Sequence, residues 1–564
     1  MSRTGPASFA HERLYFVDKL HPGHAGYVVA FALRLRGDLD AERLRLALRD
    51  LVARHEALRT TFEVRDGVLC QRIDPGADPA IEVVSRDRED EQAGDAFLRD
   101  LVTRGARTPF SLTAGPLLRA TIVSWSPAEH ALVVLVHHIA CDGWSVGILV
   151  RELAALYNAA PMPAPAPSYL DYAVAQRGEW AGDDDGLAYW REALAGAPRL
   201  ALPTDHPRPE VLSDRGAVLC RPLGAELVAA LTEWSRARQV TLFATTLAAY
   251  VEVLSAYAGQ DDIVVGVPVA NRLEEEQEAL VGCLVNTLPL RIDASGEPPF
   301  TRLVQRVRET TLSALAYQHV PFEQIVAAVT TERQLSHGPL FQTSFGLQNF
   351  PFGWPELAGL AVTEVGVEIG AAKFDLGVSV DVSADQPFVR AEYSTDLFDA
   401  GTVAALLDHY VDILRSVARA PAGAEPAIGR VRRAPAAPAV IGQPAAVAPV
   451  PAAALPAGAG AVQERIRLIW VEILNRPDVG ASDNFFDLGG NSVRMLALQQ
   501  AMNRAGFDMP LVDLFRCGSV EACARHLTAT PAPVEPDEAR SVRRDEAVRG
   551  LAERRRAHAG GSRG

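Results

Sequence analysis

The sequence has 564 residues, too many for one ordinary domain, and its 48 % hydrophobic and 22 % charged residues are typical of a soluble globular protein. A formal net charge of −15 argues against a broad nucleic-acid-binding surface. The apolar runs are too short to cross a bilayer, and the first residues lead into no signal-peptide core. We therefore expect a cytoplasmic protein with no nucleic-acid or membrane partner.

The cysteines show no spacing typical of a metal site. None forms a C-x-x-C pair, and none clusters with histidine at zinc-binding spacing. We therefore predict reduced thiols and no bound metal, as is usual inside the cell. The six cysteines are Cys70, Cys141, Cys220, Cys283, Cys517 and Cys523.

The first part of the chain alternates strand-like and helix-like segments. Residues 27–35 are rich in β-branched, aromatic and apolar residues, which favours a strand. Asp40 then offers an N-cap to a helix whose leucines recur at helical spacing. Residues 131–136 are apolar throughout, which predicts a strand buried on both faces. Residues 148–157 carry one apolar stripe, which predicts an amphipathic helix.

A second set of elements follows a proline-rich stretch. The pattern predicts a long apolar helix over 242–257 and a strand over 263–269. Because the whole region is as long as two ordinary domains, we expect a two-lobed body with a cleft. The first lobe is assigned to residues 1–175 and the second to residues 176–430.

The C-terminal third changes composition twice. Residues 431–461 are mostly alanine and proline with almost no charge, which predicts an extended linker. Residues 462–528 show a compact helical pattern, and residues 529–564 form a charged tail that we expect to be disordered. One apolar helix face in the compact segment consists of Ile466, Ile469, Trp470 and Ile473.

The motif H-H-I-A-C-D-G at 137–143 follows directly on the apolar strand. Imidazole titrates near neutrality, so a histidine at this point can accept or share a proton from an attacking amine. Asp142 is placed to pair with an arginine and fix the loop, and Gly143 would permit a tight turn. Taken alone, the motif is equally compatible with two ordinary buried histidines and a turn.

A serine-hydrolase pattern, G-W-S-V-G, overlaps this motif at 143–147. A nucleophile elbow needs its serine at a sharp turn just beyond the strand. The strand is expected to end near Val136, so we interpret Ser145 as a helix-start residue rather than a nucleophile.

The motif D-N-F-F-D-L-G-G-N-S-V occupies residues 483–493. Ser492 is predicted to start a helix directly after Gly489 and Gly490, which leaves its hydroxyl exposed. The N-terminus of a helix favours a phosphate group. The alternative is a serine that only caps the helix.

Several motifs follow one another along the chain in the same order as the core motifs of condensation domains of nonribosomal peptide synthetases, and resemble them. The similarity covers about residues 5–425. The first, S-F-A-H-E-R-L at 8–14, has His11 where glutamine is more usual. The Ser492 string, with the segment around it, resembles a peptidyl carrier protein. The other condensation motifs are R-H-E-A-L-R-T-T-F at 54–62, the double-histidine motif, Y-L-D-Y-A at 169–173, V-G-C-L-V-N-T-L-P-L-R at 281–291 and H-V-P-F-E at 319–323.

The resemblance implies an α/β (α+β) two-lobed, chloramphenicol-acetyltransferase-like pseudo-dimer with a tunnel at the active loop. A small all-α four-helix-bundle carrier domain is expected to follow it. His138 would be the catalytic residue, and Asp142 a structural residue that pairs with an arginine of the second lobe. Cys141 would be a small packing residue. The supporting active-site residues would be His137, Asp142, Gly143 and Arg272.

The implied activity is that of an acyltransferase that forms amide (peptide) bonds in secondary-metabolite and antibiotic biosynthesis. A donor acyl thioester would react with an acceptor amine, and the product would remain on a 4′-phosphopantetheine arm attached covalently to Ser492. A phosphopantetheinyl transferase would add this arm. Because the sequence shows no adenylation or thioesterase motif, we expect an adenylation enzyme to act in trans. An upstream donor carrier protein would bring the aminoacyl or peptidyl thioester.

Two alternatives remain open. A hydroxyl acceptor would give an ester instead of an amide. A catalytically inactive, condensation-like platform would recruit other enzymes, although such platforms usually show a damaged double-histidine motif. An epimerase relative would share the motif but normally follows its carrier rather than preceding it.

Overall fold

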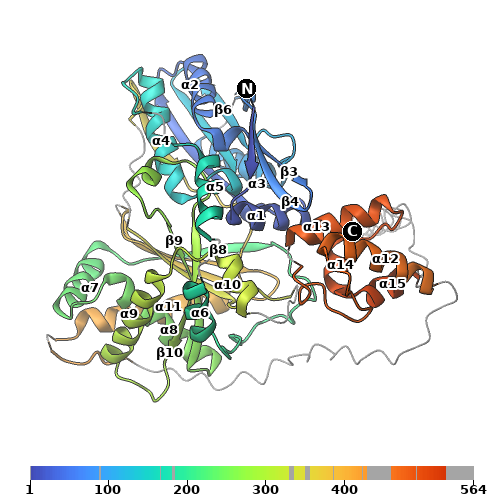
Figure 1. Cartoon of the computed structure of the whole chain (residues 1–564). Helices are drawn as coiled ribbons and strands as arrows, with labels where there is room; N and C mark the ends of the chain where they lie inside the picture. Colours follow the sequence, from blue (N-terminus) through green and yellow to red (C-terminus); the bar gives the residue numbers. More distant parts are fainter. Residues whose placement is uncertain are drawn as a thin grey trace, which may run out of the picture. The chain divides into compact units, whose positions relative to one another are not determined.

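The computed structural model divides into two compact units, a larger one that contains β1 to α11 and a smaller one that contains most of the chain from Ala452 onward (Figure 1). Each unit is described by itself. The residues that the structure describes are 2–87, 90–164, 167–180, 184–329, 336–349, 356–384, 386–421, 423–428, 459–490 and 492–528.

The first lobe of the larger unit mixes strands, α-helices and short 3₁₀-helices. Its elements are β1 (Arg3–Pro6), α1 (Phe9–Leu20), η1 (Ala25–Tyr27), β2 (Val28–Gly37), α2 (Ala41–Arg54), η2 (Glu56–Arg59), β3 (Thr60–Arg65), β4 (Val68–Ile73), β5 (Ala80–Ser85), α3 (Glu91–Arg107), β6 (Leu118–Ser126), β7 (Glu129–His137), η3 (His138–Ala140), α4 (Gly143–Asn158) and α5 (Tyr169–Trp180).

Strand β7 lies at the centre of the five-stranded sheet β12-β2-β7-β6-β5, where both its neighbours are antiparallel to it. Helices α2 and α4 cover one face, where their leucines meet Val134 and Val136. Helix α3 covers the other face, so closely that a Cβ added to Gly105 would lie 2.4 Å from Leu135 Cδ1. This two-sided cover explains why β7 has an uninterrupted apolar sequence, as predicted.

The second lobe also mixes strands, α-helices and a 3₁₀-helix. Its elements are α6 (Asp184–Ala193), β8 (Gly216–Pro222), α7 (Ala225–Ala237), α8 (Leu242–Ala258), β9 (Asp262–Val269), η4 (Glu275–Ala279), β10 (Asn286–Asp293), α9 (Phe300–Ala316), α10 (Phe322–Val329), β11 (Thr343–Gln348), β12 (Leu360–Val365), β13 (Leu376–Asp381), β14 (Phe388–Ser394) and α11 (Ala400–Arg419).

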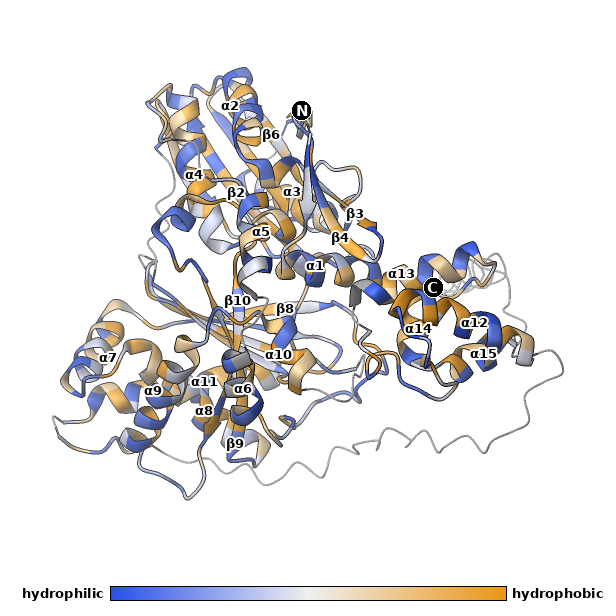
Figure 2. Cartoon of the chain, viewed as in Figure 1, coloured by the Kyte–Doolittle hydropathy of each residue, from blue (hydrophilic) through white to orange (hydrophobic). Residues whose placement is uncertain are grey.

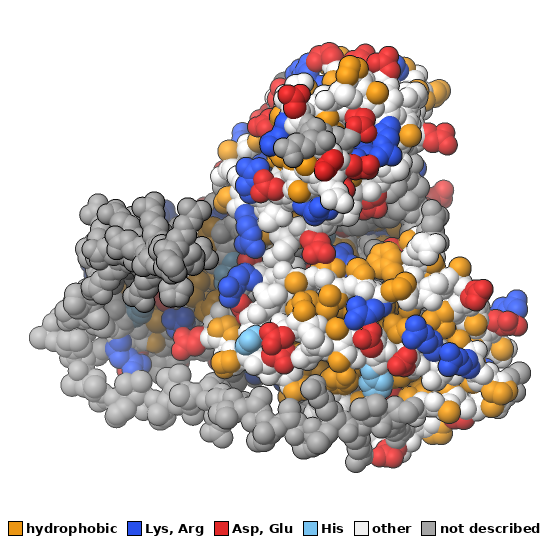
Figure 3. Space-filling model, turned by 180° about the vertical axis from the view of Figure 1, so that it is seen from behind, with side chains coloured by type: hydrophobic (Ala, Val, Ile, Leu, Met, Phe, Trp, Pro, Cys, Tyr) orange, Lys and Arg blue, Asp and Glu red, His pale blue; other side chains and the backbone are white. Residues whose placement is uncertain are grey.

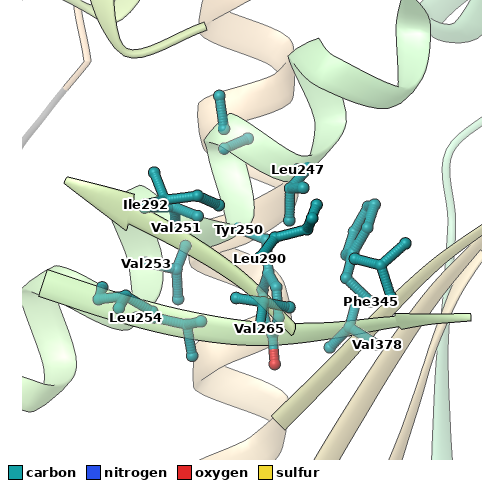
Figure 4. Close-up of a cluster of buried hydrophobic side chains, with 14 of the residues drawn as sticks. Leu247, Tyr250, Val251, Val253, Leu254, Val265, Leu290, Ile292, Phe345 and Val378 are labelled. Carbon is teal, nitrogen blue, oxygen red and sulfur yellow. The ribbon is translucent and has the colours of Figure 1, made fainter. Parts of the chain in front are cut away.

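A six-stranded sheet, β10-β9-β11-β13-β14-β8, packs against the helices of this lobe. Helix α8 supplies the centre of the core, where Leu247, Tyr250 and Leu254 contact the strands (Figure 4). Phe345 of β11 stacks on Tyr250 with ring centroids 5.6 Å apart. Burial of such large apolar and aromatic side chains is the main favourable contribution to the stability of this lobe.

Strand β12 does not belong to the sheet of its own lobe. It pairs antiparallel with β2, with Val362 opposite Leu35, and so forms an edge of the first-lobe sheet. The predicted lobe boundary, between residues 175 and 176, assigns every later strand to the second lobe and therefore does not predict this crossover. That boundary remains a prediction, while the position of β12 shows that the second half of the chain completes the first lobe.

The smaller unit is helical. The buried residues of its first helix are Ile466, Trp470 and Leu474, whereas Ile469 and Ile473 of the predicted apolar face are half-buried. The helix begins at Ala459, within the predicted linker, whose other residues lie outside the described part of the chain, as does the predicted tail. The helices of this C-terminal segment are α12 (Ala459–Leu474), α13 (Ser492–Arg504), of which the smaller unit contains the part from Leu498 onward, α14 (Leu511–Cys517) and α15 (Val520–Thr528).

The helices are striped with hydrophobic and hydrophilic residues (Figure 2). Acidic and basic side chains are interspersed over the visible face of the larger unit (Figure 3). Within the described residues, no single helix is long and apolar enough to cross a membrane; α7 and α8 pass that test only together, as a pair bent by 104°. The same residues contain no group of His, Cys, Asp and Glu that could hold a metal ion.

Candidate active site

His138 lies at the end of the central strand β7, in the short helix η3. Its ring is half-buried, while the residues on both sides of it in the chain are buried. The Nδ1 atom lies 3.8 Å from Cys283 Sγ of the second lobe, and the ring centroid lies 6.4 Å from that of Tyr27. The second histidine of the motif is therefore the one at the junction of the lobes that solvent can reach.

The first histidine of the motif serves the loop itself. His137 is buried, and its Nδ1 accepts a hydrogen bond of 3.1 Å from the backbone N–H of Ile139. The ring of Phe110 meets it edge-on, with centroids 5.8 Å apart. Burial, with smaller contributions from Lys19 and Arg119, lowers the pKa of His137 to about 3. This side chain is neutral at physiological pH and shapes the turn after β7.

The imidazole of His138 is also held in its neutral form. Burial lowers the pKa of His138 well below its ordinary value, and the positive charge of Lys373 lowers it further. A hydrogen bond to its own backbone opposes these effects, while Arg13 and His137 reinforce them. When one ring nitrogen of a neutral imidazole donates a hydrogen bond, the other nitrogen is left as an acceptor.

Asp142 is a structural residue that joins the two lobes. Its Oδ1 accepts from the backbone N–H of Ser145 at 2.9 Å and so caps helix α4. Arg272 of the second lobe donates to Oδ2 at 2.9 Å and to Oδ1 at 3.1 Å. The N–H of Leu284 donates to Oδ2 at 3.0 Å, and both charged side chains are only 2 % exposed. The Asp142–Arg272 contact expected from the sequence is present in the structure.

Ser145 belongs to the same network rather than to a nucleophile elbow. Its hydroxyl is fully buried and lies 2.7 Å from Asp142 Oδ1 and 2.9 Å from the carbonyl oxygen of Gly282. It also accepts from the N–H of Gly282 at 3.1 Å. With its hydroxyl enclosed by these partners and no histidine among them, the serine-hydrolase pattern is a coincidence of sequence.

Two other motif residues, Cys141 and Gly143, differ in how closely their neighbours pack around them. Cys141 is buried and lines a small apolar cavity with side chains of β7 and α4, which agrees with a packing role. Gly143 is exposed and has no positive φ, and an added Cβ would meet no atom of the described residues within 4 Å. Gly143 begins α4 beside open space, and its role in permitting a tight turn stays a prediction.

The structure adds residues that the sequence patterns did not single out individually. Arg13 of α1 lies 3.3 Å from Glu323 of α10, which joins the first condensation motif to the last. The hydroxyl of Tyr169 donates to the carbonyl oxygen of Cys283 at 2.6 Å. Cys283 itself is buried, and burial raises its pKa to about 12, so it is a neutral thiol beside His138. All of these residues lie within the motifs named above, but the sequence alone does not show which of them contact one another.

His11 occupies the position where glutamine is more usual. It is buried, stacks on Tyr169 with centroids 4.5 Å apart, and its Nε2 lies 3.1 Å from the carbonyl oxygen of Ile139. The Nδ1 atom is buried, and no residue that the structure describes forms a hydrogen bond with it. Burial lowers the pKa of His11 to about 3, so His11 supports the histidine loop as a neutral ring.

In the smaller unit, the loop before α13 is anchored by aromatic side chains. Phe485 packs edge-on against Trp470 at 5.0 Å, and Phe486 packs against Phe515 at 5.4 Å. Gly489 then adopts a φ of +88°, and Ser492 is the first residue of the 13-residue helix α13. A serine at the start of a helix, after a glycine turn, suits a phosphodiester because the helix N-terminus favours negative charge.

Comparison with known proteins identifies both parts of the chain. Residues 1–432 match the family model of the condensation domain. This chain belongs to the condensation-domain family. Residues 464–527 of the same chain match the phosphopantetheine attachment site family, whose cofactor, 4′-phosphopantetheine, is attached covalently.

The condensation domain has relatives of known role and known structure. It is 44 % identical to a linear gramicidin synthase of Brevibacillus parabrevis over 429 residues, which are 74 % of this chain but only 6 % of that much longer synthase. The crystal structure of the X-domain from teicoplanin biosynthesis is similar, with a TM-score of 0.66, 30 % identity, and coverage of 74 % of this chain and 95 % of that one. SgcC5 from Streptomyces globisporus gives a TM-score of 0.63 at 28 % identity, with coverage of 74 % and 99 %.

These comparisons confirm the predicted fold, a two-lobed α/β condensation body followed by a helical carrier region. The chain therefore combines a condensation domain similar to those of nonribosomal peptide synthetases with a phosphopantetheine attachment domain.

Proposed function

We propose that this condensation domain forms an amide bond between an acyl group on a donor carrier and an amine held on its own carrier region. The observation that carries this proposal is the position of His138, a neutral and accessible imidazole at the junction of two lobes that Asp142 and Arg272 lock together. In the reaction the amine nitrogen attacks the thioester carbonyl carbon, a C–N bond forms, and the C–S bond breaks.

His138 accepts a hydrogen bond from the attacking amine and passes its proton toward the leaving sulfur. Because the pKa of His138 is lowered, a long-lived imidazolium is disfavoured, and the residue orients the amine as much as it removes a proton. Proximity supplies much of the rate, because two tethered reactants meet in an effectively intramolecular step.

Ser492 is the proposed attachment residue of the carrier region. When bound there, 4′-phosphopantetheine supplies a thiol on a flexible arm that carries an acyl group as a thioester. The phosphodiester would lie at the N-terminus of α13, and the aromatic anchors of the preceding loop hold that helix start in place. A phosphopantetheinyl transferase and an adenylation enzyme acting in trans are the proposed partners, with an upstream carrier protein as donor.

Two other functions remain candidates. The SgcC5 structure holds a naphthyl ethanediol, and this alcohol keeps a hydroxyl acceptor, and thus an ester product, under consideration. The similar X-domain from teicoplanin biosynthesis has been solved in complex with OxyB. This complex favours a second alternative, a non-catalytic platform that recruits another enzyme. An accessible His138 favours catalysis over recruitment alone.

The deciding experiment uses the full chain in its holo form. Ser492 is loaded with L-alanyl, other aminoacyl or lactyl groups, N-acylaminoacyl thioesters on a separate carrier protein serve as donors, and both arms are followed by intact mass. We expect amide products from the wild type, and a rate about 10²–10⁴ times lower from His138→Ala, as for loss of an acid–base group.

Matched variants separate the explanations. Cys141→Ala should retain activity, and Ser492→Ala should fail to gain the mass of the arm. Products only from the lactyl acceptor would favour ester synthesis, and no product together with tight binding of a second enzyme would favour the platform. If His138→Ala condensed as fast as the wild type, the assignment of His138 would be wrong.

A further inference from the structure

Lysine is rare in this chain, and one of its lysines lies at the active site. Only two of the 55 basic residues are lysines, Lys19 and Lys373. Lys19 Nζ lies 3.1 Å from Asp18 Oδ2, whereas no carboxylate oxygen of the described residues lies within 4.0 Å of Lys373 Nζ. An ammonium group without a paired carboxylate is available to bind another negatively charged or polar oxygen.

Lys373 reaches from the second lobe to the neighbourhood of His138. It lies just before β13, where its backbone N–H donates to Glu392 Oε1 at 3.1 Å. Its side chain crosses to the first lobe: Lys373 Cγ lies 3.5 Å from where a Cβ on Gly26 would stand, and Nζ lies over the Tyr27 ring at 5.7 Å. The same Tyr27 ring lies 6.4 Å from the ring of His138. Lys373 and His138 therefore share one aromatic neighbour at the junction of the lobes.

The charges around His138 leave Lys373 as the available cation. After burial, the positive charge of Lys373 is the largest cause of the lowered pKa of His138, followed by smaller effects of Arg13 and His137, and Cys283 faces His138 as a neutral thiol. Of these, Arg13 is paired with Glu323, and His137 is neutral at physiological pH. Loss of water around its ammonium lowers the pKa of Lys373, although Glu392 opposes this. Yet solvent reaches the Lys373 side chain, so incoming substrates can reach it too.

Attack on a thioester places negative charge on the carbonyl oxygen before sulfur departs. A fixed positive group beside that oxygen accelerates acyl transfer by about 10²–10³ when the site is partly shielded from water. Lysine offers a compact point charge with three donors, whereas arginine offers a broad planar fork.

We propose that Lys373 is a further functional residue of the condensation site, whose ammonium group donates to the donor thioester carbonyl oxygen as negative charge builds on it. Lys373 keeps its proton throughout: the amine proton passes by way of His138 to the departing thiol. This inference rests on the proposed function of His138, and its test is chosen so that the two fail separately.

The test compares Lys373→Met, Lys373→Arg and Lys19→Met in the full holo chain. Lys373→Met should lower kcat by roughly 10²-fold with little change in KM, because the lost contact strengthens in the transition state. Lys373→Arg should recover at least about tenfold of this loss, and Lys19→Met, the control with the other lysine, should retain wild-type activity.

A second measurement does not need turnover. Diethyl pyrocarbonate modifies neutral imidazole, so peptide mass mapping of His138 over a pH series reports where that ring becomes protonated. Removing the Lys373 charge should move this midpoint to higher pH in Lys373→Met but not in Lys373→Arg. Thermal unfolding of each variant verifies the fold.

Unchanged kcat in Lys373→Met, or equal losses in the methionine and arginine variants, would overturn the role of Lys373 while leaving His138 intact. An active His138→Ala variant would instead refute the proposed function. A lower kcat in Lys373→Met with an unmoved His138 midpoint would also count against the proposal, because it would mean that the ammonium does not face the reacting groups.

Discussion

At the scale of single residues, the active loop depends on histidines that the fold keeps uncharged. His11 and His137 are buried with pKa values of about 3, and the pKa of His138 lies well below its ordinary value. In each case burial is the largest cause, because a charged imidazole loses its hydration inside the protein. The two histidines of the double-histidine motif therefore have different roles, since His137 is buried and only His138 is accessible.

His11 gives a prediction for the pH dependence of stability. Its pKa falls from 6.5 in the unfolded chain to about 3 in the fold, so below pH 6.5 the unfolded state binds a proton that the folded state does not. The contribution of His11 to stability is thus fully present above pH 6.5 and declines as the pH falls toward 3. The slope is about 1.4 kcal/mol per pH unit for one group.

Replacing His11 with glutamine, the residue more usual there, should remove this slope. Between pH 7 and pH 5, urea unfolding should show the wild type losing about 2 kcal/mol more than His11→Gln. His206→Gln is the control, because His206 lies on the surface near Asp399. Parallel stability curves for the wild type and His11→Gln would show that His11 is protonated in the fold.

At the scale of elements, β12 shows how one strand ties the lobes together. Its pairing with β2 begins where Leu360 lies opposite Gly37. Gly37 has a φ of +134°, and an added Cβ would lie 2.2 Å from the carbonyl oxygen of Gly359. Only glycine allows the two backbones to approach this closely.

Gly37→Ala should therefore weaken the β2–β12 pairing and destabilise the condensation body. We expect the free energy of unfolding to fall by more than about 1 kcal/mol, measured by chemical denaturation. Gly67→Ala is the matched control: Gly67 also has a positive φ, of +74°, but within the described part of the chain an added Cβ meets nothing closer than 4 Å. Equal losses in both variants would mean that backbone strain, rather than contact with Gly359, sets the cost.

At the scale of the whole molecule, the condensation body is held at its active loop by one buried ion pair. Asp142 and Arg272 lie 130 residues apart, on different lobes, and each side chain is 2 % exposed. Breaking such a pair leaves an uncompensated buried charge, which costs more than the pair itself contributes.

A double-mutant cycle tests this connection. Asp142→Ala and Arg272→Ala should each lower the free energy of unfolding by about 3–5 kcal/mol, and the double variant should lose clearly less than their sum. The exposed pair Arg221–Asp408, at 2.7 Å within the second lobe, is the control and should cost only about 0–1 kcal/mol. Additive losses at Asp142 and Arg272 would contradict a coupled pair across the lobes.

Much of this architecture could be predicted because it rests on local patterns. The apolar run of β7, the N-cap at Asp40 and the long helix α8 all form where the sequence predicts them. The crossover of β12 could not be predicted, because its short alternating pattern does not specify which sheet it joins. The surroundings of Gly143 were also missed, since a glycine in a motif does not reveal whether it serves a turn or an open space.

The sequence by itself determined the family, the order of the two parts, and the residues proposed for catalysis and for carriage of the arm, because ordered motifs and hydrophobic periodicity are local properties. Only the tertiary structure decided which histidine is accessible, that Ser145 is enclosed by Asp142 and Gly282, and that Lys373 stands near His138. Those facts depend on burial and, for the contact of Ser145 with Gly282 and the position of Lys373, on residues more than 100 positions apart. The physical chemistry of such contacts is set by packing of the two lobes, which no single segment of the chain encodes.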